Sequence, residues 1–399
     1  MSVPLAAVLV LSMALQAPAA DRTLAEQLAR SGQTAEALVL FERIVEENPA
    51  DVEARLWIAR LLLRMGRTAE AEAGFRSVLR EHPSDVDARI GLGAALTRRD
   101  AWREAVAVLR SVETDAGDNA ELFAALARAY RRAGDDRRAL DYYKRAKVLA
   151  PSDPDLIEAY EGTLRAYGSS IEFEGLAESG VSDARSGALT GSLRVLPRLL
   201  IQGIVRVQDR DESSDAVGGG GAVWRLNRST NVEFRIGGGI DNTALANGDV
   251  TGEVRHYRGA FEIGVNIRHL SFTGVSVTAL SPILAWDTGE RWRLAARYSY
   301  SRSSFSTTGE TSRDHSVLFR ETFRAWRRVD TTLTYAYGIE SFEDLTADRL
   351  ANLGANTVAA TLRIRMPSLT SVAATWEHQS RSNDTRLDRL TVVLVQTLR

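Results

Sequence analysis

The sequence predicts a chain of two folded parts, an N-terminal α-helical superhelix and a C-terminal antiparallel transmembrane β-barrel. Residues 21–168 repeat with a period of about 34 positions, which is typical of stacked helix pairs. Residues 169–399 instead alternate between apolar and polar side chains, which is the period of a β-strand. A short apolar segment precedes both parts, and the length of 399 residues suffices for two domains.

The composition excludes several classes of protein. Lys and Arg number 50 against 52 Asp and Glu, and the net charge of −2 lacks the basic excess of a nucleic-acid binder. The chain has no Cys, so disulfide scaffolds, cysteine nucleophiles and thiolate metal sites are excluded. A lipoprotein anchor, which needs a Cys at the cleavage site, is excluded as well.

The first 20 residues have the pattern of a secretory signal peptide. The segment Leu5–Leu15 is apolar, and Ala17, Pro18 and Ala19 supply small residues around a cleavage site. An apolar helix of this length is too short to cross a hydrocarbon core of about 30 Å. We therefore expect residues 1–20 to be removed on export, leaving domains at 21–168 and 169–399.

Four kinds of position recur in residues 21–168: a turn residue, a small residue, a large apolar residue and a helix-ending residue. In chain order they are Gly32, Gly66, Asp100 and Gly134; Ala37, Ala71, Ala105 and Ala139; Phe41, Phe75, Leu109 and Tyr143; and Pro49, Pro83, Gly117 and Pro151. The small residue lets two helices approach closely, and the proline ends the second helix. This pattern resembles the tetratricopeptide repeat (TPR) and predicts four repeats.

A further helical segment, roughly Asp155 to Tyr167, is expected to cap the last repeat. The TPR resemblance implies a concave groove that docks a protein partner. On the first helices of the repeats, Arg60, Arg128 and Arg131 occupy positions that face this groove in the family. The alternative for these three residues is a solvated helix face without a binding role.

Residues 169–399 contain about 14 alternating segments of roughly ten residues, with 12 strands as an alternative count. In Arg291–Tyr300, for example, Trp292, Leu294 and Tyr298 share one face, and charged residues occupy the other. Such strands could build a soluble β-sandwich or propeller, or an outer-membrane barrel.

The links between these strands favour the barrel. Short links such as Leu196–Arg198 alternate with longer polar links such as Asp209–Asp215 and Glu343–Leu350, as in outer-membrane barrels. The tryptophans make the same point, because four of them lie within a few residues of a short link, as in an interfacial girdle. They are Trp224, Trp286, Trp292 and Trp326.

This half, placed behind a TPR array, resembles the YaiO-type outer-membrane β-barrel family. The resemblance rests on Val195–Arg198 at a turn, on Arg268–Phe272 leaving a strand, and on Leu280–Pro282 before Trp292–Leu294. It implies a Gram-negative outer-membrane protein with its TPR domain in the periplasm. The chain departs from the usual ending of outer-membrane barrels, because Leu398 and Arg399 stand where an aromatic residue is expected.

The sequence offers no catalytic or metal-binding pattern, so we expect no enzyme activity, no cofactor and no metal. The five His residues form no i, i+4 pair and no H-E-x-x-H motif. The glycine runs Gly218–Gly221 and Gly237–Gly239 are followed by no Lys-Ser/Thr, and are read as close strand contacts rather than phosphate loops. Glu343 and Asp344 are neighbours in an expected outer loop, where acidic residues are usually solvated.

Two functions account for both halves of the chain, and both place the barrel in outer-membrane lipid. The first is passage or export of a polar polymer such as exopolysaccharide, and the second is a non-conducting anchor for a TPR scaffold. A third, a simple porin for small solutes, fits the barrel but leaves the TPR array without a role. Arginine on a lipid-facing midplane costs roughly 2–4 kcal/mol, so the strand arginines are expected to face the lumen. These arginines are Arg293, Arg297, Arg320, Arg324, Arg363 and Arg365.

The arrangement of acids around these arginines separates the two functions. Pairing with acids such as Glu233, Glu253, Glu262, Glu340 and Glu377 would fill the lumen with ion pairs and favour the anchor. Clustering away from the acids would form a basic track for an anionic or hydroxyl-rich chain. The sequence favours the track by a small margin, since Arg293 to Arg324 span two neighbouring strands.

Overall fold

The computed structural model describes residues 21–180, 183–210, 213–240, 242, 244–289, 291–338, 354–381 and 385–398. The expected signal peptide, Glu340 and the pair Glu343 and Asp344 lie outside these residues. The chain divides into two compact units, and the division falls between Thr163 and Leu164. Each unit is described separately.

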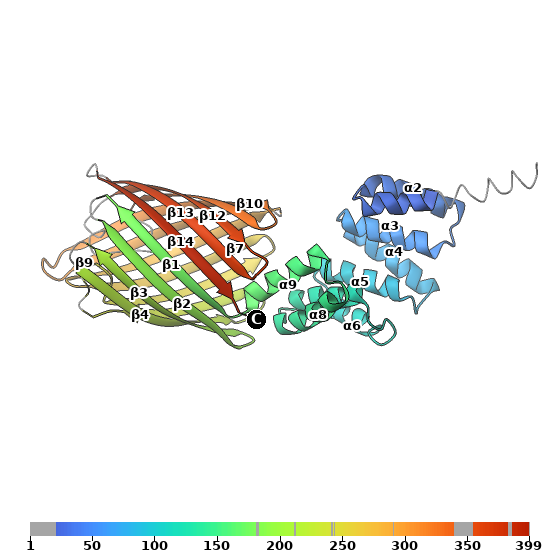
Figure 1. The fold of residues 1–399 in the computed structure, drawn as a ribbon, viewed down its shortest axis with the longest axis horizontal. Helices are drawn as coiled ribbons and strands as arrows, with labels where there is room; N and C mark the ends of the chain where they lie inside the picture. Colours follow the sequence, from blue (N-terminus) through green and yellow to red (C-terminus); the bar gives the residue numbers. More distant parts are fainter. Residues whose placement is uncertain are drawn as a thin grey trace, which may run out of the picture. The chain divides into compact units, whose positions relative to one another are not determined.

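The first unit is built from antiparallel helix pairs (Figure 1). Residues 21–30 are helical. The helices that follow are α2 (Thr34–Glu47), α3 (Val52–Arg64), α4 (Thr68–Glu81), α5 (Val86–Arg98), α6 (Trp102–Arg110), α7 (Ala120–Arg132), α8 (Asp136–Leu149) and α9 (Pro154–Tyr167). Each first helix also packs on the next first helix, α3 on α5 and α5 on α7, which stacks the pairs into an array.

The turn position of each repeat has a left-handed backbone. The φ angle is 85° at Gly32, 80° at Gly66 and 73° at Gly134, and Asp100 has the same conformation with φ 64°. Glycine adopts this region without steric cost, and Asp is among the few other residues that tolerate it. The assignment of Asp100 to the turn of the third repeat is therefore confirmed.

The recurring small and large residues form the core of the helical unit. The four recurring small residues are fully buried: Ala37, Ala71, Ala105 and Ala139. The four large residues, Phe41, Phe75, Leu109 and Tyr143, have exposed fractions of at most 1%. Their burial confirms the predicted register. Two glycines in the middle of α5 were not recognised as packing positions. A Cβ on Gly91 would lie 2.2 Å from the ring of Phe75, and one on Gly93 would lie 2.4 Å from Leu109.

Side-chain caps fix the start of the first helix in repeats two to four, and of α9. Asp51, Asp85, Asn119 and Asp153 each accept a hydrogen bond from the backbone N–H three residues later. This contact satisfies one of the amide groups that a helix start leaves unpaired, and typically contributes about 1 kcal/mol. The caps explain why the repeats resume at a constant spacing after each interhelical link.

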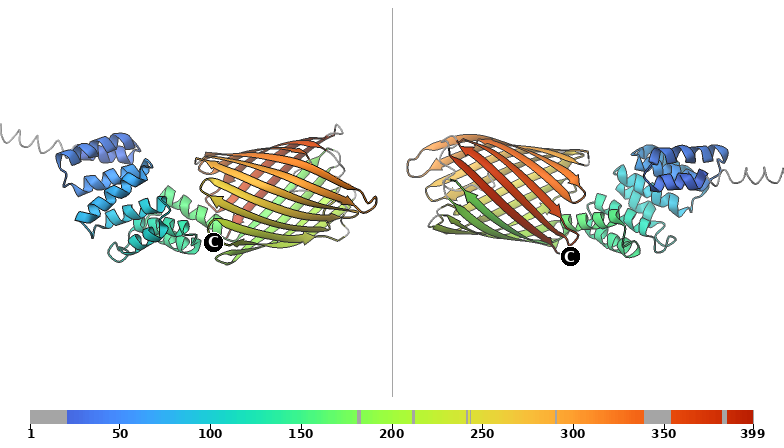
Figure 2. Two further views of the ribbon diagram at one scale, coloured as in Figure 1. Left: turned by 180° about the vertical axis from the view of Figure 1, so that it is seen from behind. Right: turned by 45° about the horizontal axis from the view of Figure 1, so that its top comes forward.

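The second unit is a closed barrel of fourteen antiparallel strands (Figures 1 and 2). The strands are β1 (Ser170–Ser179), β2 (Ala184–Leu196), β3 (Leu199–Arg210), β4 (Ser213–Arg225), β5 (Thr230–Gly238), β6 (Gly248–Arg258), β7 (Phe261–Phe272), β8 (Val275–Thr288), β9 (Trp292–Phe305), β10 (Thr311–Trp326), β11 (Val329–Gly338), β12 (Ala355–Arg365), β13 (Thr370–Arg381) and β14 (Arg386–Thr397). Each strand pairs with its neighbour in sequence, and β1 also pairs with β14, which closes the ring. The predicted count of 14 is confirmed over the alternative of 12.

One expected loop is largely strand. β3 continues through Arg210 and β4 begins at Ser213, so the segment Asp209–Asp215 is not the long link that its polar composition suggested. The polar residues of this segment belong to the barrel wall instead. Asp215, for example, is 96% buried inside the barrel, where it accepts hydrogen bonds from backbone amides.

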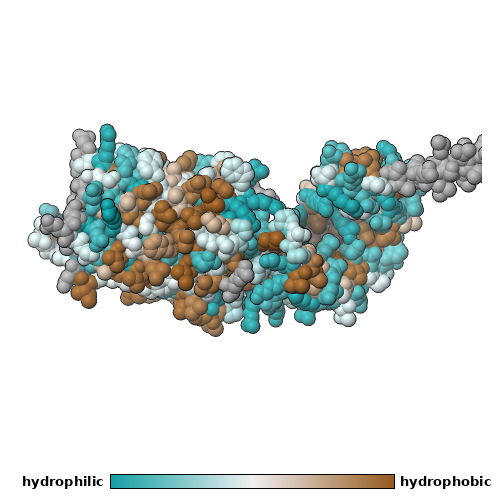
Figure 3. Space-filling view, in the orientation of Figure 1, coloured by the Kyte–Doolittle hydropathy of each residue, from teal (hydrophilic) through white to brown (hydrophobic). Residues whose placement is uncertain are grey.

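The two faces of the wall differ sharply in polarity. On β7, Phe261, Ile263 and Ile267 are more than half exposed, whereas Glu262 between them is 3% exposed. The apolar side chains therefore point outward and the charged ones inward. Figure 3 shows hydrophobic residues gathered over the barrel strands on the face in view. Glu321 on β10 is an acidic residue on the outer face, opposite Leu294 and Leu333.

The four tryptophans named above all lie on the outer face or at its rim, beside the links that join even-numbered strands to the next strand. Their exposed fractions run from 42% for Trp292 to 71% for Trp326. Large apolar rings in this position match one aromatic girdle of a membrane barrel. Among the described residues, no helix is both long and apolar enough to cross a bilayer.

The barrel lumen as a candidate functional site

All six predicted arginines lie on strand positions that face the lumen. Arg293 and Arg297 alternate on β9 with exposed outward residues, as Arg320 and Arg324 do on β10 and Arg363 and Arg365 on β12. Arg293, Arg297 and Arg320 share the lining of one internal cavity of about 140 Å³. The structure therefore brings three of the six together on neighbouring strands.

Acidic residues lie among these arginines. Arg293 pairs with Glu262 and, at 2.9 Å, with Asp287, and Arg255 pairs with Glu253 and, at 3.3 Å, with Glu262. Glu262 thus bridges two guanidinium groups while its side chain is 97% buried. A carboxylate buried to this degree is stable only when charged hydrogen-bond donors surround it.

A second group of arginines surrounds Asp330 on β11. Its carboxylate lies 2.9 Å from Arg365 and 3.8 Å from Arg324. Arg363 stands directly opposite Asp330 in the register of β11 and β12. Arg324 and Arg365 thus share one acid, and Arg363 lies on the strand position opposite it. Of the two arrangements expected from the sequence, the structure matches a lumen filled with ion pairs more closely than an uninterrupted basic track.

A third ion-pair cluster was not predicted. Glu178 on β1 lies 3.0 Å from Arg210 and 2.9 Å from Arg389, and all three side chains are at least 91% buried. Arg389 also lies 3.4 Å from Glu377 on β13. Sequence reasoning missed this cluster because Glu178 and Arg389 are 211 positions apart. The inward alternation of Glu172, Glu174 and Glu178 on β1 was the signal that could have found it.

An internal cavity of about 550 Å³ lies mainly against the inner faces of β1 to β5. Part of its wall consists of glycine backbone from Gly218–Gly221 and Gly237. A Cβ on Gly219 would lie 2.9 Å from the carbonyl oxygen of Ile236 and 3.0 Å from the Cα of Gly237. This close approach confirms the interpretation of the glycines as strand contacts. The same glycines leave part of this wall without side chains, beside the space of the cavity.

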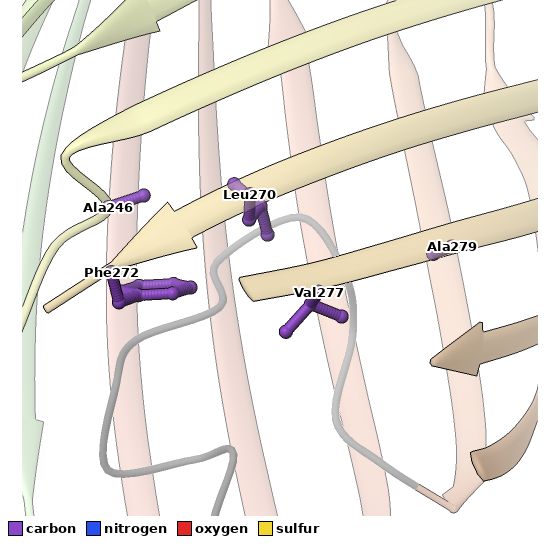
Figure 4. Packing of buried hydrophobic residues seen from close by; sticks show 5 residues of the cluster. All are labelled: Ala246, Leu270, Phe272, Val277 and Ala279. Atoms are coloured by element: carbon purple, nitrogen blue, oxygen red, sulfur yellow. The ribbon is translucent and has the colours of Figure 1, made fainter. Parts of the chain in front are cut away.

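A short segment before β6 folds inward beside this cavity. The carboxylate of Asp215 accepts hydrogen bonds from the backbone N–H groups of Ala244 (2.6 Å) and Leu245 (2.8 Å). Ala246 packs with Leu270, Phe272, Val277 and Ala279, as Figure 4 shows. Leu245, Ala246 and Leu270 are also part of the cavity wall. The segment therefore adds apolar side chains to the wall of this cavity.

The three predicted groove arginines lie on two different helices. Arg60 on α3 forms an ion pair with Asp87 at 3.0 Å, and its guanidinium lies 5.7 Å from the centre of the Trp57 ring. Arg128 and Arg131 are exposed on α7, and α5 packs between α3 and α7.

An aromatic cluster at α6 to α8 was missed by the sequence analysis. Tyr130 and Tyr142 stack with ring centres 5.5 Å apart, and Arg145 lies 3.8 Å from the centre of Phe123. The hydroxyl of Tyr142 donates to Glu113 at 3.2 Å. The two tyrosines come from α7 and α8, so their spacing in the sequence gives no sign of the contact.

The described residues contain no group of three or more His, Asp and Glu side chains placed to hold a metal ion. The arginine and carboxylate side chains of the lumen offer hydrogen bonding and charge pairing. Such groups bind and orient polar molecules.

Comparison with known families matches the helical unit. Three tetratricopeptide repeat family models match residues 28–87, 58–120 and 122–157. The chain therefore contains TPR repeats followed by a closed barrel. No curated protein matches the chain by sequence.

Several solved structures align with a comparable part of this chain. TTC0263, a TPR protein of Thermus thermophilus, is 26% identical over 37% of this chain and 82% of its own, with a TM-score of 0.35. MamA of Desulfovibrio magneticus RS-1 is 21% identical over 37% and 82%, with a TM-score of 0.31. PilF of Pseudomonas aeruginosa is 17% identical over 38% and 69%, with a TM-score of 0.33.

Proposed function

We propose that this protein is an outer-membrane barrel of a Gram-negative bacterium that anchors a TPR docking domain in the periplasm. The observation that carries the proposal is the closed barrel with apolar side chains outside and ion pairs inside. A closed barrel satisfies all strand hydrogen bonds internally, which a lipid environment requires. The expected signal peptide and the resemblance to the YaiO-type family support the same location.

The periplasmic partner of this anchor is a protein that docks on the TPR array. Helical repeats of this kind present an extended surface, and aromatic and arginine side chains dominate the energetics of protein interfaces. Arg128 and Arg131 on α7 are exposed, and Arg60 lies beside Trp57. We assign these residues to the docking groove and propose no catalytic role for the chain.

Passage of a polar polymer such as exopolysaccharide is the second candidate. The cavity of about 550 Å³ favours it, because arginine and glutamate side chains line this space inside the barrel beside a glycine wall. In this alternative the TPR domain guides the polymer or docks the machinery that makes it. The ion pairs at Glu262, Asp330 and Glu178 oppose it, since they hold lumen side chains together across strands.

Single-channel recording in planar bilayers separates the two candidates. We would compare the wild type with the double variant Arg297→Glu plus Arg320→Glu, and use Arg258→Glu on the outer face as the matched control. A non-conducting anchor gives no channel steps in any of the three proteins. Channel steps in the wild type and in Arg258→Glu, with altered conductance in the double variant, would refute the anchor and establish passage through the lumen.

A further inference from the structure

Two arginines face each other on the outer surface of the barrel. Arg302 on β9 stands directly opposite Arg313 on β10 in the strand register. Both are exposed, and the neighbours of Arg302 in sequence, Ser301 and Ser303, are buried at 1% and 2%. Arg302 therefore points away from the lumen. Arg313 lies an even number of positions from the outward-facing Phe319 on the same strand, so its side chain points outward as well. Like charges placed directly opposite each other in a sheet destabilise it.

Neither guanidinium makes an ion pair or a hydrogen bond with another described residue, so no acid among the described residues offsets the two charges. At two other places on the outer face a cation lies beside an acid. Arg185 on β2 stands opposite Asp209, and His378 on β13 contacts Asp388 at 2.9 Å. The Arg302–Arg313 pair differs from these two sites, because a second cation stands where they have an acid.

Polar and aromatic side chains surround the pair. One step from the arginines along the same face, His315 stands opposite Tyr300 and hydrogen-bonds the hydroxyl of Tyr298. On the other side of Arg302 lies Thr278, whose hydroxyl contacts His269 at 2.9 Å. These groups can hydrogen-bond to an anion held between the arginines, and the tyrosines resemble an interfacial girdle.

The position of the pair along the barrel axis matches the edge of the apolar band, where the membrane surface lies. Arg302 lies ten residues along β9 from Trp292, which marks the other end of the apolar band. Ten residues of antiparallel strand extend about 34 Å. With the usual tilt of barrel strands this is about 25 Å along the barrel axis, the height of the apolar band of outer-membrane barrels. The two arginines therefore lie at the level of lipid headgroups.

We propose that Arg302 and Arg313 together bind the phosphate of a phosphorylated lipid in the outer leaflet. The proposal rests on the proposed membrane location of the barrel. Side chains directly opposite on neighbouring strands have Cβ atoms about 5 Å apart, so both guanidinium groups can reach one phosphate. Each guanidinium can donate two parallel hydrogen bonds to phosphate oxygens, and a bound dianion removes the repulsion between the two cations.

The test uses the purified full-length protein in detergent and measures binding of diphosphoryl lipid A, with dephosphorylated lipid A as the comparison lipid. The variant is Arg302→Ala plus Arg313→Ala. The matched control, Arg185→Ala plus Arg258→Ala, also removes two outer-face arginines. We expect the variant to bind the phosphorylated lipid at least about tenfold more weakly, because charge-assisted hydrogen bonds are lost. The control should bind like the wild type.

Three results would overturn the proposal: equal binding by the variant and the wild type, equal binding of both lipids, or complete competition by millimolar inorganic phosphate. The last would identify free phosphate as the ligand. Fractionation of the wild type distinguishes a failure of this proposal from a failure of the proposed function. A wild type absent from the outer membrane refutes the location itself. A wild type present there that binds no phosphorylated lipid refutes only the phosphate site.

Discussion

The buried hydroxyl of Tyr143 makes the stability of the last repeat depend on pH. Its ring is 99% buried between helices, and this burial raises the pKa of its hydroxyl above the ordinary value of about 10. The charges of Arg128 and Arg131 act in the opposite direction but are the smaller effect. The folded state therefore keeps Tyr143 neutral at a pH where an unfolded chain begins to lose the proton.

We predict that the helical unit loses stability above about pH 10 partly through Tyr143. As the pH rises past the unfolded pKa, the unfolded state releases a proton that the folded state retains, so the free energy of unfolding falls. In Tyr143→Phe this contribution is absent. Thermal unfolding of residues 21–168 between pH 8 and pH 11 should show a smaller decline for the variant. Parallel declines in both proteins would contradict the prediction.

At the scale of one helix, α4 shows how closely the repeats are packed. Ala71 is fully buried, whereas Ala69 in the same helix is exposed. A larger side chain at a fully buried position must displace its neighbours, which typically costs about 1–3 kcal/mol. The same substitution at an exposed helical position costs little, because leucine is nearly as good a helix former as alanine.

We predict that a fragment of residues 21–168 is soluble and helical, and that Ala71→Leu lowers its unfolding free energy by about 1–3 kcal/mol. Ala69→Leu should change it by less than about 0.5 kcal/mol. Far-ultraviolet circular dichroism with chemical denaturation measures both. A spectrum dominated by strand or coil would contradict the repeat assignment, and equal effects of the two substitutions would contradict the packing argument.

The elements also show where sequence reasoning succeeds and where it stops. The 34-residue period locates Ala71 and Asp100, because each repeat buries its residues against the next in the same way. Strand alternation places Arg293 on the lumen face, since side chains of a strand alternate strictly. Alternation does not give the partner acids, because Glu262 and Arg293 meet only through the stagger of three strands. The inward fold of Ala246 depends on Asp215, which the sequence placed in a loop.

At the scale of the whole molecule, the proposed location predicts how the protein behaves in cells and on gels. The full-length chain should fractionate with the outer membrane. It should also run faster on a denaturing gel when it is not boiled, because a closed barrel has no free strand at which unfolding can begin. The unfolding transition is measured from the gel mobility of purified membranes heated to a series of increasing temperatures. Recovery of the chain in the soluble periplasm would contradict the membrane location.

The pairing of β1 with β14 sets the order in which this protein can fold. It brings Ser170 opposite Thr397, while every other strand pair joins neighbours in sequence. Neighbouring hairpins form after short loop closures, but this contact must bring together residues more than 200 positions apart. Closure is therefore the last step of folding. Until it occurs, the nascent sheet has two open edges, and each can accept a strand from a second copy as readily as from its own chain.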